Sequence, residues 1–289
     1  MQIISKDLTF AYNKKAEFNR QALNGVNLVI EEGDFFGIIG HTGSGKSTFI
    51  QHLNGLIKTQ SGTLKVGNYD LSKGVKNKPS VLKELRSEVG MVFQYPEYQL
   101  FAETVFEDVA FGLKNFTNGK SPKEIESAVR DALTIVGLDF DAVKDKSPFD
   151  LSGGQKRRVA IAGVIVTKPE VLVLDEPVAG LDPKGKEEFM ELLHKLHSSF
   201  VKTVIMVSHD MDLVAEHATK VAVFDDGRVV SYGTPKEVFS DADKIYGIGL
   251  ELPLTAYLEN RLKENGVIID SDLTLKDFTE KVAEKGVKL

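Results

Sequence analysis

The chain has no cysteine among its 289 residues. This absence excludes disulfide bonds and thiolate zinc sites, and it fits the reducing environment of the cytoplasm. Long hydrophobic runs are also missing, since the longest, at about Val159 to Val166, is far too short to cross a bilayer. Residues 1–10 alternate like a strand, so we expect no N-terminal signal peptide. We therefore expect any membrane association to run through protein partners.

An excess of basic charge is lacking as well. The formal net charge is −6 and the isoelectric point is near 5.6, which argues against a nucleic-acid partner. Hydrophobic residues make up 42% of the chain, which is enough to bury a full core. The length allows one large or two modest domains.

The segment 40–47 fits the pattern G-x-x-x-x-G-K-[S/T], which binds the phosphates of a nucleotide. Its glycines let main-chain N–H groups curl around the phosphates, because glycine tolerates a positive φ. Lys46 would place its charge at the β- and γ-phosphates, and Ser47 would complete the shell of a Mg²⁺ ion. A buried strand over 35–39 and a helix over 47–56 would aim the positive end of the helix at the triphosphate. The predicted ATP-binding residues here are Gly40, His41, Thr42, Gly43, Ser44, Gly45, Lys46, Ser47 and Thr48.

Two carboxylates follow a second buried strand, the apolar run 171–174. Asp175 would hold Mg²⁺ through water, and Glu176 would polarise the attacking water as a general base. An acidic turn after a core strand would explain the pair equally well if it stood alone. The phosphate-binding segment 40–47, which we call the P-loop, favours the catalytic interpretation, because ligands bind at the carboxyl ends of parallel strands.

Polar or aromatic residues end three further strands. His209 could bridge the γ-phosphate and the catalytic water, and Gln94 could reach both Mg²⁺ and that water. Tyr12 could stack on adenine. Each residue also has a plainer interpretation, as a surface histidine, a loop amide and a half-buried strand-end aromatic respectively.

The stretch Leu151-Ser152-Gly153-Gly154-Gln155 opens a long helical segment. With the P-loop, Gln94, the pair 175–176, the segment 179–182 and His209, it forms an ordered set of motifs. This set resembles the nucleotide-binding domain of ATP-binding cassette (ABC) proteins over roughly residues 2–240. The resemblance implies an α/β P-loop NTPase fold with a parallel-sheet core and a small antiparallel β subdomain. A helical subdomain over about 95–168 would carry the stretch 151–155, called the signature in this family, and a C-terminal α extension would follow.

The resemblance also implies that two subunits pack head to tail, with ATP between the P-loop of one and the signature of the other. Ser152 and Gly154 would then contact the γ-phosphate held by the partner, where the N-terminus of a helix favours an anion. Asp182 would lie at the dimer seam. The residues expected to act on the partner's ATP are Ser152, Gly153, Gly154, Gln155 and Asp182.

Segments 41–45, 51–56 and 94–101 are similar to the ATPases of energy-coupling factor (ECF) transporters. The last segment and the C-terminal tail favour the larger, A-prime type of the two paired ATPases. This resemblance implies a second ECF-type ATPase, a transmembrane T component and a substrate-binding S component as partners, at the cytoplasmic side of the cell membrane. The cargo would be a vitamin or similar micronutrient. The T component would contact Tyr95, Pro96, Glu97, Tyr98, Gln99, Leu100 and Phe101, although an ordinary aromatic-rich surface turn would also explain them.

One residue departs from the family pattern. Val178 stands where a hydroxyl residue is usual between Pro177 and Ala179. The change removes a possible hydrogen bond but touches no expected ligand of Mg²⁺ or water. We therefore expect ATP hydrolysis to remain possible.

The remaining patterns place elements around these motifs. Strands are predicted over 2–10, 22–30 and 62–66, core strands ending at Ile39, Phe93, Leu174 and Val207, and a hairpin over 221–232. A capping box at Ser121 and a stop at Gly137 predict a helix, and a further helix is predicted over 183–200.

The ATPase domain would span 1–233 and the helical extension 234–289. In the extension, Thr234 and Thr274 are predicted caps. Leu254, Tyr257, Leu258 and Leu262 would form one apolar stripe, and Leu275, Phe278 and Val282 another. The extension could pack on its own domain or help hold two ATPases together, since amphipathic spacing cannot name the partner.

Several other functions are consistent with parts of the pattern. The same motifs would serve the ATPase of a conventional ABC importer or of a cobalt/nickel uptake system. A soluble ABC ATPase of DNA repair or translation is disfavoured by the absence of a coiled-coil insert, of cysteine and of a second cassette. A non-catalytic scaffold is disfavoured by the intact Glu176 and His209. The ECF resemblance predicts a heterodimer, yet both half-sites look complete, so the residues alone would allow a homodimer.

Overall fold

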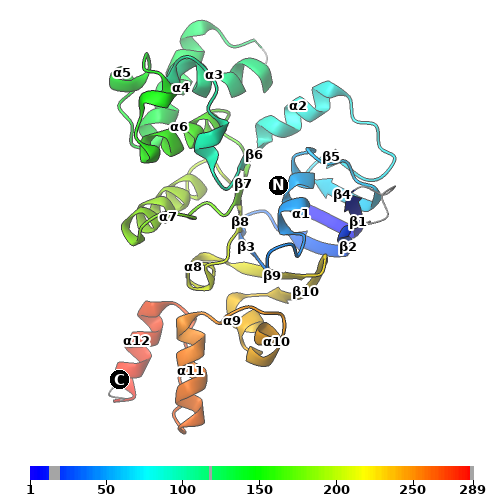
Figure 1. Cartoon of the computed structure of the whole chain (residues 1–289), viewed down its shortest axis with the longest axis vertical. Helices are drawn as coiled ribbons and strands as arrows, with labels where there is room; N and C mark the ends of the chain where they lie inside the picture. The colour runs from blue at the N-terminus through cyan, green and yellow to red at the C-terminus, as the bar shows by residue number, and fades with distance from the viewer. Residues whose placement is uncertain (13–19, 117–118, 287–289) are drawn as a thin grey trace.

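The computed structural model describes residues 1–12, 20–116 and 119–286. Its larger sheet runs in the order β10-β9-β3-β8-β7-β6 (Figure 1). These strands are β3 (Phe35–Ile39), β6 (Val89–Val92), β7 (Val171–Asp175), β8 (Thr203–Val207), β9 (Lys220–Asp225) and β10 (Arg228–Gly233). All neighbours are parallel except β9 and β10, which form the predicted antiparallel hairpin. The predicted core strands are thereby confirmed.

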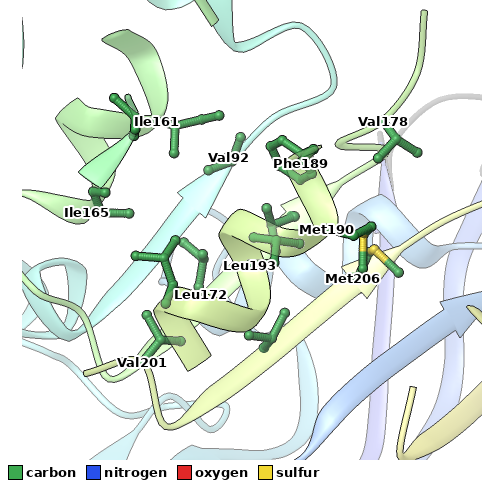
Figure 2. Close-up of a cluster of buried hydrophobic side chains, with 14 of the residues drawn as sticks. Val92, Ile161, Ile165, Leu172, Val178, Phe189, Met190, Leu193, Val201 and Met206 are labelled. Atoms are coloured by element: carbon green, nitrogen blue, oxygen red, sulfur yellow. The ribbon is translucent and has the colours of Figure 1, made fainter. Parts of the chain in front are cut away.

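Apolar side chains cover both faces of this sheet. Successive residues of a strand point to opposite faces, so Leu172 and Leu174 join one core while Val171 and Val173 join the other. Helices cover the first face, where Val92, Leu172 and Met206 pack with side chains of α6 (Gly153–Ile165) and α7 (Pro183–His197) (Figure 2). Burial on both faces explains why these strands are continuous apolar runs rather than alternating ones.

The second sheet is antiparallel, in the order β2-β1-β4-β5, and confirms the predicted small β layer. Its strands are β1 (Ile3–Tyr12), β2 (Arg20–Ile30), β4 (Ser61–Val66) and the short β5 (Tyr69–Asp70). It shares a core with α1 (Lys46–Leu53), through Phe49 and Ile50. The helix predicted over 47–56 ends three residues early, because Gly55 takes a left-handed φ of 68°.

A helical lobe lies on the other side of the larger sheet (Figure 1). It contains α3 (Val105–Phe116), α4 (Pro122–Ile135), α5 (Phe140–Val143), the 3₁₀ turn η2 (Pro148–Asp150) and α6 (Gly153–Ile165). The capping box at Ser121 is present, and Gly137 follows α4 with a φ of 75°. The sequence prediction missed α2 (Pro79–Glu88), which carries one buried residue, Leu85. The 3₁₀ turn η1 (Pro96–Gln99) joins β6 to the lobe.

Helix α7 (Pro183–His197) follows β7, and α8 (Met211–His217) follows β8. Helix α7 ends three residues before the predicted Phe200. In the part of the chain that the structure describes, no helix is long and apolar enough to cross a membrane.

The C-terminal helices are α9 (Pro235–Phe239), α10 (Ala242–Gly247), α11 (Leu254–Glu264) and α12 (Leu275–Glu284). The predicted caps at Thr234 and Thr274 are present, and α10 was not predicted. Val238, Phe239, Ile245 and Leu250 join the main core, so the beginning of the extension packs on its own domain.

The predicted apolar stripes of the extension are wrong in part. Leu254, Tyr257 and Leu275 are exposed. Leu258 and Leu262 of α11 instead pack with Phe278 and Val282 of α12 in a small separate cluster. The two helices thus stabilise each other, and the outer side of α11 carries unburied apolar side chains.

The separate cluster predicts a local effect of mutation. Phe278→Ala should destabilise α11 and α12 by about 3 kcal/mol, because it empties a fully buried ring site. Limited proteolysis should then cleave the chain downstream of residue 250 at a lower urea concentration than in the wild type, while ATP binding stays unchanged. Leu275→Ala, on an exposed side chain of the same helix, is the matched control, with an expected change below about 0.5 kcal/mol. Equal effects of the two variants would contradict this packing.

Candidate functional site

The P-loop lies between β3 and α1 and approaches two neighbouring segments closely. Gly40 has a φ of 151°, and a Cβ there would lie 2.2 Å from the Phe224 carbonyl oxygen. Gly45 has a φ of 104°, and a Cβ there would lie 2.4 Å from the Ala22 carbonyl oxygen. Only glycine fits both positions, so the loop is curled by its packing against β2 and β9.

Lys46 is buried at the base of this loop. Its Nζ donates to the carbonyl oxygens of Gly40 at 2.6 Å and His41 at 2.9 Å. Burial lowers the pKa of Lys46, while Glu176 and Asp175 act in the opposite direction. The ammonium group is therefore held by weak, neutral acceptors that a phosphate oxygen could replace.

A cavity of about 210 Å³ opens beside the loop, lined by Tyr12, Ala22, Gly43, Gly45, Lys46, Ser47 and Thr48. The Ser44 hydroxyl oxygen is buried nearby without a hydrogen-bond partner among the described residues. The Tyr12 hydroxyl lies 3.3 Å from the Thr48 hydroxyl, and its ring meets Phe10 edge to face. The half-exposed Tyr12 ring thus forms a flat wall at the cavity mouth. A cradle of this shape fits the triphosphate of a nucleotide whose base lies beside Tyr12.

Asp175 and Glu176 stand at the end of β7, opposite the P-loop. Asp175 is buried, which raises its pKa, while a hydrogen bond with Ser47 and the charge of Lys46 lower it. Glu176 has a left-handed φ of 50°, and its main-chain N–H donates to the Val207 carbonyl at 3.0 Å. Burial raises the pKa of Glu176 to about 7, against the lowering effects of the His209 main chain and Lys46. A carboxyl group with this pKa can accept a proton near neutral pH.

His209 follows β8 and meets Glu176 directly. Its Nε2 lies 3.1 Å from Glu176 Oε1, and its main-chain N–H donates to Oε2 at 3.4 Å. Burial and the charge of Lys46 lower the pKa of His209. Gln94 lies beyond β6 at the same sheet edge, but its exposed side chain makes no hydrogen bond to any described residue.

The ring of His41 is turned away from the cavity. Its Nε2 lies 3.0 Å from Asp225 Oδ1, and its Nδ1 lies 2.9 Å from the Thr42 carbonyl oxygen. The Gly227 N–H donates to the Ser44 carbonyl at 3.0 Å. Sequence reasoning treated 225–227 only as a hairpin turn, and it missed that this turn supports the P-loop.

The signature stands at the N-terminus of α6, in the helical lobe. Ser152 and Gln155 form a capping box, with the Ser152 hydroxyl accepting from the Gln155 N–H at 3.3 Å. Ser152, Gly153 and Gly154 are exposed, so the free N–H groups of the first turn face solvent. Figure 1 shows α6 and α1 in different lobes of the chain. Asp182 caps α7 by accepting from the Gly185 N–H at 2.7 Å.

Exposed aromatic rings mark the segment after Gln94. Tyr98 is 83% exposed, and Tyr95 and Phe101 are also exposed, whereas Pro96 and Leu100 are buried. Phe111 of α3 meets Phe101 edge to face with ring centroids 4.9 Å apart. The sequence prediction did not include Phe111, which joins the patch only through the fold. We call Tyr95, Tyr98, Phe101 and Phe111 the aromatic patch.

Comparison with known proteins gives consistent results. A family model described as ABC transporter matches residues 23–179. The energy-coupling factor transporter ATP-binding protein EcfA2 of Clostridium tetani is 47% identical over 285 residues, covering 99% of this chain and 96% of that protein. The EcfA2 protein of Clostridioides difficile is 49% identical over 284 residues, covering 98% of this chain and 96% of that protein.

Solved structures resemble the fold as well. The structure of cbiO1 from Clostridium perfringens, part of the ABC transporter complex cbiONQ, has a TM-score of 0.72 at 38% identity. It covers 89% of this chain and 98% of cbiO1. A dimeric, post-hydrolysis structure of the ATP-binding cassette MJ0796 with ADP and Pi has a TM-score of 0.71 at 31% identity, covering 81% of this chain and 98% of MJ0796.

The raised pKa of Glu176 predicts a pH-dependent cost to stability. The folded value of about 7 exceeds the ordinary 4.5, so the folded protein binds this proton more tightly than the unfolded chain. The resulting stabilisation is complete below pH 4.5 and is lost as the pH rises to 7. Above pH 7, the charged Glu176 carboxylate lowers the free energy of unfolding by up to about 3 kcal/mol.

Glu176→Gln should therefore stabilise the nucleotide-free protein at about pH 8 and change it little at about pH 4.5. Urea unfolding in EDTA at both pH values measures the difference. The same change in stability at both would show that burial does not perturb this carboxyl group.

Proposed function

The chain belongs to the ABC transporter family, and we propose that it is the ATP-hydrolysing subunit of an ECF transporter at the cytoplasmic side of the cell membrane. The observation that carries the proposal is the placement of Glu176, with a pKa of about 7, opposite a P-loop cavity that fits a triphosphate. The high identity to EcfA2 proteins, over nearly their full length, supports the transporter class.

ATP binding would follow from the P-loop geometry. Main-chain N–H groups of residues 43–48 would surround the phosphates, and Lys46 would exchange the carbonyls of Gly40 and His41 for phosphate oxygens. Tyr12 would stack on the base. Ser47, Asp175 and Gln94 would hold a Mg²⁺ ion, which neutralises charge on the phosphates when bound. Ser47 lies close enough to lower the pKa of Asp175, so two of these oxygen ligands are already neighbours.

Hydrolysis needs a base and a group that orients the water. Glu176 would accept the proton of the attacking water, and His209, 3.1 Å away, would orient that carboxylate and reach the γ-phosphate. Because the pKa of His209 is lowered, its ring is largely neutral near pH 7 and can both donate and accept hydrogen bonds.

The site is incomplete within one subunit. The exposed N-terminus of α6 lies in a different lobe from the P-loop, so a γ-phosphate held by one chain would meet Ser152 and Gly154 of another. Gly153, Gln155 and Asp182 would line the same seam. We propose a second ECF-type ATPase as this partner, so that ATP binding closes the pair and hydrolysis reopens it.

The aromatic patch would receive the transmembrane T component. It joins exposed rings directly after Gln94, so a change at the nucleotide would reach the partner through a few residues. A separate S component would bind the transported vitamin or similar micronutrient. The alternative of a cobalt/nickel or conventional importer predicts other co-purifying subunits, and mass spectrometry of the gently extracted complex tests it.

Glu176→Gln should lower kcat for ATP hydrolysis by a factor of about 10² or more while ATP affinity stays close to that of the wild type, because the P-loop is unchanged. Phosphate release and equilibrium binding of labelled ATP measure the two quantities. Hydrolysis at the wild-type rate would refute the assignment of the base.

Tyr98→Ala should weaken association with the T component about tenfold or more, because it removes the most exposed ring of the aromatic patch. ATP binding by the isolated subunit should not change. Tyr246→Ala is the matched control, since Tyr246 is also exposed but lies on α10. Retention of the T component in pull-downs from membranes is the measurement, and equal retention by both variants would move the docking surface elsewhere.

A further inference from the structure

We propose that Arg157 is a positioning residue for ATP hydrolysis: its guanidinium fastens the chain segment after Glu176 to the signature helix α6. This inference rests on the proposed function, because it assigns Arg157 an effect on the Glu176 base. It concerns a residue that does not line the P-loop cavity.

Arg157 is buried, unlike its neighbours Lys156 and Arg158. Its Nη1 donates to the Ala179 carbonyl oxygen at 3.2 Å, and its Nη2 donates to the Pro177 carbonyl oxygen. The planar fork of a guanidinium can bind two carbonyls of one segment at once, which an ammonium group cannot do in the same way. The guanidinium also lies 6.0 Å from the centre of the Phe189 ring.

The segment that Arg157 holds is the direct continuation of Glu176. The Ala179 N–H donates to the Glu176 carbonyl at 3.2 Å, so Pro177 to Ala179 form a turn behind the carboxylate. Val178 is buried in the same apolar core as Phe189 and Met190 of α7 (Figure 2). The turn is therefore fixed through the Val178 side chain and through two carbonyls, those of Pro177 and Ala179, which have Arg157 as their donor.

A third element lies within electrostatic reach of the same guanidinium. The Glu97 carboxylate of η1 interacts electrostatically with Arg157, and η1 packs on α6. Glu97 Oε2 is buried with no hydrogen-bond partner within the described ranges, so the positive charge of Arg157 is what offsets it. Arg157 thereby links α6 to the turn behind Glu176 by hydrogen bonds, and its charge also attracts the Glu97 carboxylate of the 3₁₀ turn that carries Tyr98.

Burial of this charge is not explained by stability. A buried guanidinium loses its hydration, and burial lowers the pKa of Arg157 despite Glu97. An apolar side chain of similar volume often serves a core as well or better. A charge that links three functional segments has a purpose if those segments must move together.

The test is steady-state ATP hydrolysis by the assembled transporter carrying Arg157→Met. We expect kcat to fall about tenfold or more, because a displaced base loses its alignment, while KM for ATP stays within about twofold. Arg157→Lys should recover only part of kcat, since it restores the charge beside Glu97 but not the two-carbonyl fork. Lys156→Met is the matched control: it removes the same charge one residue earlier, where no hydrogen bond or ion pair to a described residue is lost.

A double-mutant cycle separates positioning from general damage to the fold. Asp182→Ala perturbs the end of the same segment. The fold-loss of kcat in the double variant should therefore be smaller than the product of the fold-losses in Arg157→Met and Asp182→Ala. A loss in the double variant that equals this product, or an unchanged kcat in Arg157→Met, would overturn the inference. A fall in melting temperature that Arg157→Lys fully repairs together with kcat would also overturn it, because the role would then be structural.

The outcome for the wild type keeps the two hypotheses apart. If the assembled wild-type transporter does not hydrolyse ATP, the proposed function fails before Arg157 is tested. If the wild type hydrolyses ATP and Arg157→Met does so equally well, only the inference about Arg157 fails. If Arg157→Met does not fold, Arg157→Lys in the same cycle with Asp182→Ala decides the question.

Discussion

The site depends on one arrangement of charge, in which buried Lys46 faces buried Asp175 and partly buried Glu176 at the carboxyl edge of a parallel sheet. The sheet enforces this arrangement, because β3, β7 and β8 are parallel neighbours and their ends meet at one edge. Burial raises the pKa values of both carboxyl groups and lowers that of the lysine, so each charge lacks the solvation it would have in water. The Lys46 ammonium is meanwhile held only by neutral loop carbonyls. A triphosphate with its cation would supply the charges that this edge is built to balance.

The signature, which would supply the second half of the proposed chemistry, stands in a different lobe. Helix α6 presents free N–H groups to solvent, and it begins with Gly153 and Gly154, which carry no side chain. An anion-binding helix end that faces outward is explained by a second subunit. On the proposed function, the chain needs internal connections between the lobe that would serve a partner's nucleotide and the edge that would serve its own. Arg157 is such a connection, since it begins on α6 and ends at the carbonyls behind Glu176. Its charge also attracts Glu97 of η1, the 3₁₀ turn that carries Tyr98 of the aromatic patch.

The motifs predicted the sheet edge well because each is short and contiguous. The apolar runs before Gly40, Asp175 and His209 are buried on both faces and could only be core strands. Elements without such a signal were missed: α2 buries one residue, β5 has two residues, and α10 is a short polar helix. The stripe on α11 was misjudged because helical spacing does not tell which side of an apolar face meets α12. The role of Arg157 was invisible for another reason. Arg157 donates to main-chain carbonyls, and because every residue has one, the sequence of the accepting segment does not indicate such a bond. Arg157 also lies between two basic residues, a pattern that suggests a solvated surface.

The central claim is that a nucleotide held by one subunit is completed by the signature of another. Sedimentation velocity tests it most directly, with the Glu176→Gln chain alone and together with the second ATPase from the extracted complex. Mg²⁺ and ATP should convert the subunits into a stable pair, and Ser152→Arg should abolish this conversion while ATP still binds to the P-loop. Association that ignores ATP, or a pair that forms equally well with Ser152→Arg, would contradict the account.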